Sequence, residues 1–232
     1  MHFEDMLTNR EGNHASFITW AFIMKKFIVE LIGTFFLVFT VGMCVLNPDA
    51  GVIAPLAIGS VLMVMIFAGG HISGGHFNPA VTVAVAIRGR MLASEVTAYV
   101  LAQLTGAVLA AGAVTFLKGI NQDISVNDHS LGQIALAEFL FTFALAYVVL
   151  NVATAKANAG NSFYGLAIGF TVMSGAFAVG PISGGAFNPA VATGCLYLGL
   201  IPAASFPVYL GAQLSAGAFA AYIFKTLNPD DK

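Results

Sequence analysis

The sequence predicts an all-α integral membrane protein with six transmembrane helices, two re-entrant half-helices and an inverted 3+3 repeat. The chain of 232 residues is 58% hydrophobic and only 9% charged, an apolar excess that a soluble domain of this size does not bury. It contains six long apolar stretches. It also contains the sequence Ser-Gly-Gly-x-Phe-Asn-Pro-Ala-Val twice, beginning at Ser73 and at Ser183.

The six apolar stretches are each close to the roughly 20 residues that a helix needs to cross a bilayer. Two shorter apolar segments each begin with Asn-Pro and are too short to span. Asn is a favoured N-cap and Pro is favoured at the first helical position, so each short segment is predicted to be a half-helix. We expect the spans at 27–46, 52–71, 95–117, 132–153, 163–181 and 203–224, and the half-helices at about 78–87 and 188–198.

The chain reads as a duplication. Glu30 in the first half corresponds to Glu138 in the second, and the two Asn-Pro-Ala sequences correspond to each other. Each half contains three spans, so the two halves must have opposite orientations in the membrane. We expect one channel domain at 24–225, made of repeats at about 24–118 and about 131–225, with an N-terminal cytoplasmic extension at 1–23 and a C-terminal tail at 226–232.

The charged residues predict the orientation. With six spans, both termini lie on one side, and that side collects Arg10, Lys25, Lys26, Arg88, Arg90, Lys156, Lys225 and Lys232. The other side has Lys118 beside three aspartates. Because basic loops remain inside, we expect both termini in the cytoplasm and a multi-pass protein of the plasma or inner membrane.

Several function classes are excluded by composition. The net charge of −2 leaves no basic footprint for nucleic acid. The two cysteines, Cys44 and Cys195, lie in apolar stretches and indicate neither a disulfide framework nor a metal site. No nucleophile–base pair is recognisable, so we expect neither an enzyme nor a cofactor.

The re-entrant segments predict a pore through the lipid bilayer. Extended backbone at membrane depth is tolerated only against protein or a water-filled cavity. Two helix N-termini that meet near the midplane place positive potential there, which repels cations and protons. We expect each Asn to cap its own helix and to keep its NH2 group free as a donor. The predicted ladder of acceptors comprises the carbonyls of Gly74, Gly75, His76, Gly184, Gly185 and Ala186.

Through these paired sequences the chain resembles the aquaporin (major intrinsic protein) family over about residues 26–225. The resemblance implies a passive channel that conducts water and small neutral solutes and excludes protons and ions. It also implies a homotetramer with one pore in each subunit. The motif residues that it assigns to the pore are Asn78, Pro79, Ala80, Asn188, Pro189 and Ala190.

The family resemblance also assigns a selectivity filter, and here the sequence departs from the usual pattern. Counting from the motifs places the four filter positions at Ile58, Ala176, Gly185 and Val191. The usual water-selective set is an aromatic residue, His, a small residue and Arg. With Val in place of Arg, the set resembles the vacuolar (tonoplast) subgroup of plants. We therefore expect a wider, apolar filter that also admits glycerol, urea, ammonia or hydrogen peroxide.

Glu30 and Glu138 have two interpretations, because carboxylates inside spans are functional candidates by default. They are the groups that a secondary transporter with inverted repeats would use as a proton relay. Alternatively, each accepts hydrogen bonds from the backbone of the neighbouring re-entrant segment. Their duplication, with one Glu beside each segment, favours this loop-supporting role.

Overall fold

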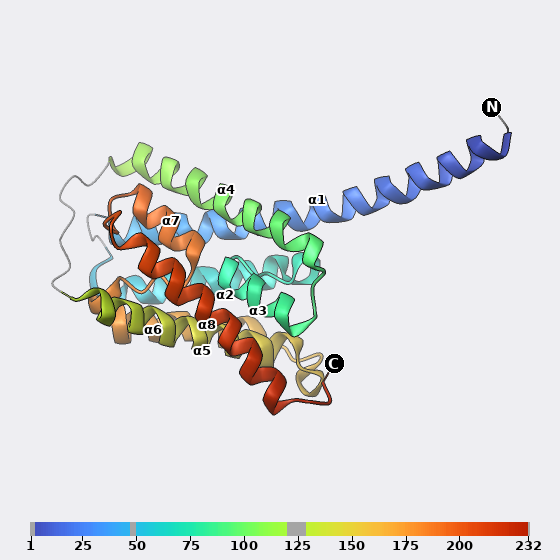
Figure 1. Ribbon diagram of the computed structural model, residues 1–232. Helices are drawn as coiled ribbons and strands as arrows, with labels where there is room; N and C mark the ends of the chain where they lie inside the picture. Colours follow the sequence, from blue (N-terminus) through green and yellow to red (C-terminus); the bar gives the residue numbers. More distant parts are fainter. Residues whose placement is uncertain (1–2, 47–49, 120–128, 232) are drawn as a thin grey trace.

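The computed structural model describes residues 3–46, 50–119 and 129–231, with side chains from Phe22 onward. Within these residues six helices are long and apolar enough to cross a membrane, which confirms the predicted spans. Figure 1 shows them packed side by side as one bundle. The helices are α1 (Phe3–Val45), α2 (Ala54–Ser73), α3 (Pro79–Arg88), α4 (Ala93–Lys118), α5 (Leu131–Val149), α6 (Tyr164–Ser183), α7 (Pro189–Tyr197) and α8 (Phe206–Leu227), with short turns at Gly51–Ile53, Leu150–Thr154 and Lys156–Asn158.

The first helix is longer than the sequence suggested. The expected span starts at residue 27, whereas α1 runs unbroken from Phe3 and extends well beyond the bundle. No proline, the residue that breaks helices most strongly, interrupts the sequence before Pro48. The apolar part is Phe22–Val45. The expected boundary between extension and domain, at residue 23, is therefore not a break in secondary structure.

The two half-helices begin where Asn-Pro predicts. The side-chain oxygen of Asn78 accepts from the backbone N–H of Ala80 at 2.9 Å, and Asn188 accepts from Ala190 at 2.9 Å. Helix α3 packs against α8, and α7 packs against α4. Each half-helix thus lies on the last span of the other repeat. In Figure 1, α3 lies toward the end with the C-terminus and α7 toward the opposite end, as an inverted repeat requires.

Glycines allow the helices to approach each other closely. A Cβ on Gly59 of α2 would lie 2.6 Å from the carbonyl oxygen of Gly169 on α6, and one on Gly169 would lie 2.5 Å from that of Gly59. Where α8 crosses α3, a Cβ on Gly217 would lie 2.4 Å from the carbonyl oxygen of Ala80. Such small-residue contacts are how membrane helices pack without a hydrophobic driving force.

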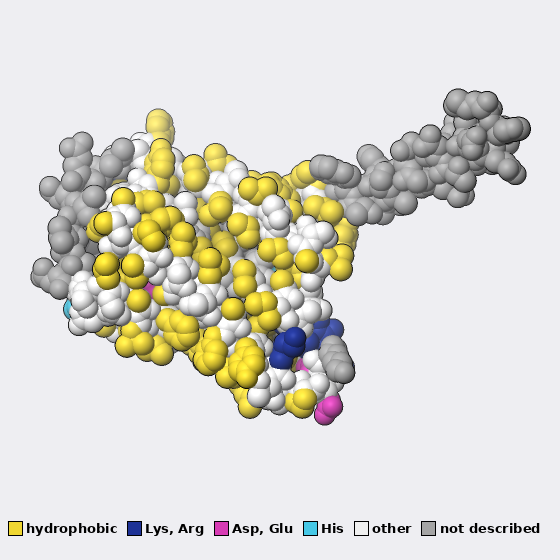
Figure 2. All heavy atoms as spheres, viewed as in Figure 1, with side chains coloured by type: hydrophobic (Ala, Val, Ile, Leu, Met, Phe, Trp, Pro, Cys, Tyr) yellow, Lys and Arg dark blue, Asp and Glu magenta, His cyan; other side chains and the backbone are white. Residues whose placement is uncertain are grey.

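The surface of the bundle is apolar along its length and charged at one end. Figure 2 shows hydrophobic side chains over the visible flank and Lys and Arg side chains gathered near the C-terminus. Phe116 of α4 is 89% exposed, and Leu136, Phe177 and Phe219 are also exposed. A flank of this kind requires lipid or another subunit as its solvent. We call the charged end, with Lys26, Arg88, Arg90, Lys156 and Lys225, the basic end.

The contact between α8 and α3 gives a stability prediction. Replacing Gly217 with Ala places a methyl group against the Ala80 carbonyl, and backbone cannot move aside as a flexible side chain can. We expect a loss of about 1–3 kcal/mol in the free energy of unfolding, seen as a lower thermal midpoint in detergent. Gly211→Ala on the same helix is the control, because nothing lies within 4 Å of its added Cβ. Equal midpoints for the two variants would contradict this packing.

Candidate functional site

Each re-entrant segment has the same backbone conformation in both repeats. Gly74 and Gly184 end the preceding helices with φ values of 90° and 85°, a region that favours glycine. Three residues further on, Phe77 and Phe187 have φ values of 48° and 49°, which residues other than glycine rarely adopt. Both phenylalanines are buried. A backbone in this region persists only where surrounding contacts hold it.

The carboxylate of Glu30 supplies these contacts in the first repeat. It accepts hydrogen bonds from the backbone N–H groups of Phe77 at 2.7 Å and His76 at 2.9 Å. It also accepts from the side chains of Ser73 and Gln103, at 2.7 and 2.8 Å. A fully buried carboxylate is tolerated only when it has partners of this kind. The geometry is the one that the loop-supporting interpretation expects.

Glu138 makes the same set of contacts in the second repeat. Its donors are the N–H groups of Phe187 at 2.7 Å and Ala186 at 3.1 Å. The side chains of Ser183 and Gln213 complete the set at 2.6 and 2.8 Å. The oxygens of each carboxylate are therefore occupied by hydrogen bonds that hold one re-entrant segment.

Asn78 and Asn188 join the two re-entrant segments to each other. Besides capping its own helix, Asn78 donates from Nδ2 to the carbonyl of Phe187 at 3.0 Å, and Asn188 donates to the carbonyl of Phe77 at 2.8 Å. The prediction of an entirely free NH2 group is therefore wrong, because one N–H of each amide is bonded across the repeats. An NH2 group carries two N–H donors, so the second remains for a molecule in the pore.

A narrow cavity lies where the two segments meet, and we call it the lumen. Its volume is about 20 Å³, which is room for about one water molecule. Both motif asparagines, Asn78 and Asn188, are on its wall. The remaining side chains of the wall are apolar except for His76. The arrangement presents a few polar groups to a narrow space between apolar surfaces.

Three of the four predicted filter positions lie on the lumen wall. These are Ile58, Gly185 and Val191. Ala176 is not among the lining residues, whereas Val172, one helical turn earlier on α6, is. Ala176 instead lies behind Gly185, since a Cβ on Gly185 would approach the Ala176 Cα to 3.3 Å. Residues four apart share a helix face, so counting along the chain reaches the correct side of α6 but falls one turn beyond the side chain on the wall.

The predicted carbonyl ladder lies mostly on cavity walls. In the first segment, the hydroxyl of Tyr99 donates to the carbonyl of Ser73 at 2.6 Å, and Asn188 takes that of Phe77. The carbonyls between them accept no hydrogen bond from any residue that the structure describes, so they are available to water. The residues on the lumen wall are Gly75, His76, Gly185 and Ala186; Gly74 lines a second cavity, and Gly184 lines neither.

Helices α1 and α5 also contribute to the lumen wall, with residues that were not predicted from the sequence. Leu37 and Val41 line the lumen from α1, and Leu145 and Val149 line it from α5. These residues follow Glu30 and Glu138 by seven and eleven positions, which places them on the helix face that carries each carboxylate. That periodicity was the signal that could have identified them.

The second cavity opens at the basic end, and we call it the vestibule. Its volume is about 670 Å³, and its wall includes Arg90, Tyr99, Lys156 and Asn161. Part of this wall is the connection between α5 and α6. There the Asn161 amide donates to the carbonyls of Val152 and Asn158, both at 2.7 Å. Among the described residues, no group of three or more His, Cys, Asp or Glu side chains could hold a metal ion.

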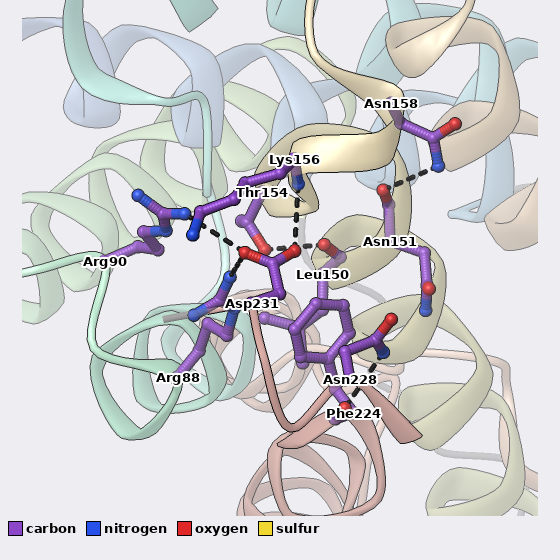
Figure 3. Close-up of polar contacts among 10 residues, drawn as sticks. All are labelled: Arg88, Arg90, Leu150, Asn151, Thr154, Lys156, Asn158, Phe224, Asn228 and Asp231. Atoms are coloured by element: carbon purple, nitrogen blue, oxygen red, sulfur yellow. Dashed lines mark hydrogen bonds and ion pairs between the residues drawn. The ribbon is translucent and has the colours of Figure 1, made fainter. Parts of the chain in front are cut away.

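Asp231, in the expected C-terminal tail, joins three parts of the basic end (Figure 3). Its carboxylate accepts from the guanidinium of Arg88 at 2.7 Å and that of Arg90 at 3.3 Å. It also accepts from the backbone N–H of Lys156 at 2.9 Å. Arg88 is itself buried and stacks over the ring of Phe224. The tail thus holds the vestibule wall to α3, a role that its short polar sequence did not indicate.

Comparison with known proteins gives a family and a set of relatives. The family model described as Major intrinsic protein matches residues 16–181 and 164–231. The chain is 33% identical to Aquaporin NIP1-2 of Arabidopsis thaliana, over 90% of this chain and 76% of the relative. It is 32% identical to the probable aquaporin NIP-type of Nicotiana alata, over 97% of this chain and 86% of the relative. Nodulin-26 of Glycine max is 38% identical over 74% of this chain and 66% of the relative.

A solved structure supports the fold independently. The aquaglyceroporin from Plasmodium falciparum superimposes with a TM-score of 0.73, covering 89% of this chain and 98% of the other. The sequence identity is 21%, so the likeness concerns the fold alone.

The Asp231 contacts predict a pH dependence at the basic end. The hydrogen bond from Lys156 and the charge of Arg88 hold the pKa of Asp231 below its ordinary value. The contact therefore stabilises fully at pH values above the unfolded-state pKa of Asp, and it is lost as the pH falls through the lower folded-state pKa. Asp231→Asn is expected to imitate this loss at neutral pH. Hydrogen exchange of the peptide around Lys156 should be faster in the variant.

The control for this experiment is Asp230→Asn, which removes the neighbouring exposed carboxylate. Comparing variant and wild type at one pH removes the intrinsic pH dependence of exchange. Faster exchange should appear in Asp231→Asn alone. Identical exchange in Asp231→Asn and wild type would show that the tail does not hold this wall.

Proposed function

Because the chain belongs to the major intrinsic protein family, we propose that it is a passive channel for water and small uncharged solutes. Glycerol, urea, ammonia and hydrogen peroxide are the candidate solutes. The observation that carries the proposal is the meeting of two half-helix N-termini at the lumen, with Asn78 and Asn188 on its wall. No group in this arrangement forms or breaks bonds, so the molecule that passes is unchanged.

The arrangement favours neutral hydrogen-bonding molecules over ions. The free N–H of each motif asparagine donates to the oxygen of a molecule in the lumen, and the exposed carbonyls accept its hydrogens on either side. The two half-helix N-termini each contribute about half a positive charge at this point. A cation or a hydrated proton meets that potential in a narrow apolar channel that does not rehydrate it.

The filter positions support a solute range beyond water. Ile58, Gly185 and Val191 bring neither a charge nor a side-chain hydrogen-bond donor to the wall. The lumen is nevertheless narrow, so solutes larger than water pass only when its apolar side chains move. The likeness to the vacuolar subgroup rests on these positions alone, because the relatives described above are NIP-type and nodulin-26 proteins. We therefore place the chain nearer to the NIP-type proteins than to the vacuolar subgroup.

The alternative of a proton-coupled transporter has little support from the carboxylates. Glu30 and Glu138 each accept four hydrogen bonds from their re-entrant segment and its neighbours. A relay group needs to exchange its proton with the transport path, and neither glutamate is on the wall of the lumen. A passive channel needs both glutamates only to hold the re-entrant segments, and their hydrogen bonds serve that role.

The same reasoning extends to assembly and orientation. We infer that the basic end faces the cytoplasm, because Lys and Arg are retained on that side of a membrane. Both termini would then be cytoplasmic, in a plasma or inner membrane. The exposed apolar flank, with side chains such as Phe116 and Phe177, supports contact with lipid and with further copies in a homotetramer.

The filter proposal is tested by Val191→Arg. An Arg at this position adds bulk and positive charge to the lumen wall, so glycerol and urea permeability should fall about tenfold relative to water permeability, a change of about 1.4 kcal/mol in barrier height. The measurement is stopped-flow light scattering on proteoliposomes with osmotic gradients of each solute. Val191→Met separates length from charge. An unchanged ratio of solute to water permeability in Val191→Arg would count against Val191 as a filter residue.

A further inference from the structure

Two residues border both the lumen and the vestibule. The walls of the two cavities have only His76 and Val149 in common. His76 comes from the first re-entrant segment, and Val149 is the last residue of α5. A solute that moves from the vestibule into the lumen therefore passes these two residues. We call this point the inner ring.

The inner ring has a smaller counterpart in the other half of the pore. The repeat relates His76 to Ala186 and Val149 to Val41. Ala186 and Val41 also line the lumen, so the path is bounded by His and Val on one side and by Ala and Val on the other. The imidazole ring is the largest difference between the two halves of the wall. The filter positions near Ala186 do not supply a side chain as large as this imidazole, because one of them is Gly185.

The imidazole is held in place from three sides. Its backbone N–H is bound by Glu30, its Nδ1 lies 3.2 Å from the hydroxyl of Thr82, and its ring centroid lies 5.0 Å from that of Tyr99. The side chain is also buried. A ring with these contacts does not swing aside as an exposed histidine does, so its bulk stays between the two cavities.

The contact with Thr82 also determines which ring nitrogen is available. The Thr82 hydroxyl donates its single proton to the carbonyl of Asn78, at 3.1 Å. In the tautomer compatible with that bond, Nδ1–H of His76 donates to the Thr82 oxygen, and Nε2 carries no hydrogen. No residue that the structure describes donates to Nε2. The inner ring thus presents one hydrogen-bond acceptor, and its other member, Val149, is an apolar surface.

We propose that His76 and Val149, rather than the filter positions, determine which uncharged solutes this channel conducts. The inference rests on the proposed function as a passive channel. The inner ring excludes by width and selects by hydrogen bonding, since a solute with an O–H or N–H donor can pair with Nε2 as it passes. Glycerol and urea carry such donors but are wider than water. Their passage is therefore limited at the inner ring, whereas the filter positions bring no charge and no side-chain hydrogen-bond donor that would select among them.

The test is the ratio of glycerol to water permeability in proteoliposomes. Val149→Ala widens the inner ring without touching the re-entrant backbone, and it should raise this ratio about tenfold, a change of about 1.4 kcal/mol in barrier height. His76→Ala should raise it in the same direction. The matched control is Val148→Ala, the same truncation one position earlier, where the side chain lines neither cavity. Its ratio should equal that of the wild type.

The outcomes separate this inference from the proposed function. Wild-type protein without water or solute flux would overturn the channel itself. Wild-type flux with unchanged ratios in both Val149→Ala and His76→Ala would overturn the inner ring alone. If His76→Ala lowers the thermal midpoint, Val149→Ala decides the result. A ratio that rises equally in Val148→Ala would show a general loosening of α5 and would also reject the proposal.

Discussion

The buried carboxylates of Glu30 and Glu138 are the constraint on which the rest of the site depends. Each one binds two consecutive backbone N–H groups of a segment that has left its helix. Without those acceptors, the N–H groups would be unpaired at membrane depth, where water cannot replace the missing partner. The carboxylates thereby hold Phe77 and Phe187 in the left-handed region, and this turns their carbonyls toward the asparagine of the opposite repeat.

Hydrogen bonds and helix packing between the repeats join the two halves into one structure. Asn78 reaches a carbonyl of the second repeat and Asn188 a carbonyl of the first, while each half-helix packs on the last span of the other half. The side-chain donors that face the lumen are therefore positioned by contacts from both repeats. Small residues at the crossings, such as Gly217 against Ala80, allow the half-helices to approach closely enough for these bonds.

The features that depend on local chemistry could be predicted from the sequence. Asn-Pro identified both half-helix starts, and the duplication identified the glutamates as supports. The hydrogen bonds from Asn78 and Asn188 across the repeats were not predicted, because they join residues more than a hundred positions apart. The contacts of Asp231 were not predicted either, since a charged residue in a short polar segment is expected to be exposed to solvent. Counting from the motif also fell one helical turn away from the α6 side chain that lines the lumen, which is Val172 and not Ala176.

The central claim is that the channel conducts neutral molecules while the half-helix N-termini exclude protons without a filter Arg. Proteoliposomes that contain a pH-sensitive dye test this directly, with osmotic water permeability measured on the same vesicles. The account predicts that water permeability rises with the amount of protein, while an imposed pH gradient decays as slowly as in protein-free vesicles. A decay rate that increases with the amount of protein would contradict it, because protons would then be crossing at the paired asparagines or through the glutamates.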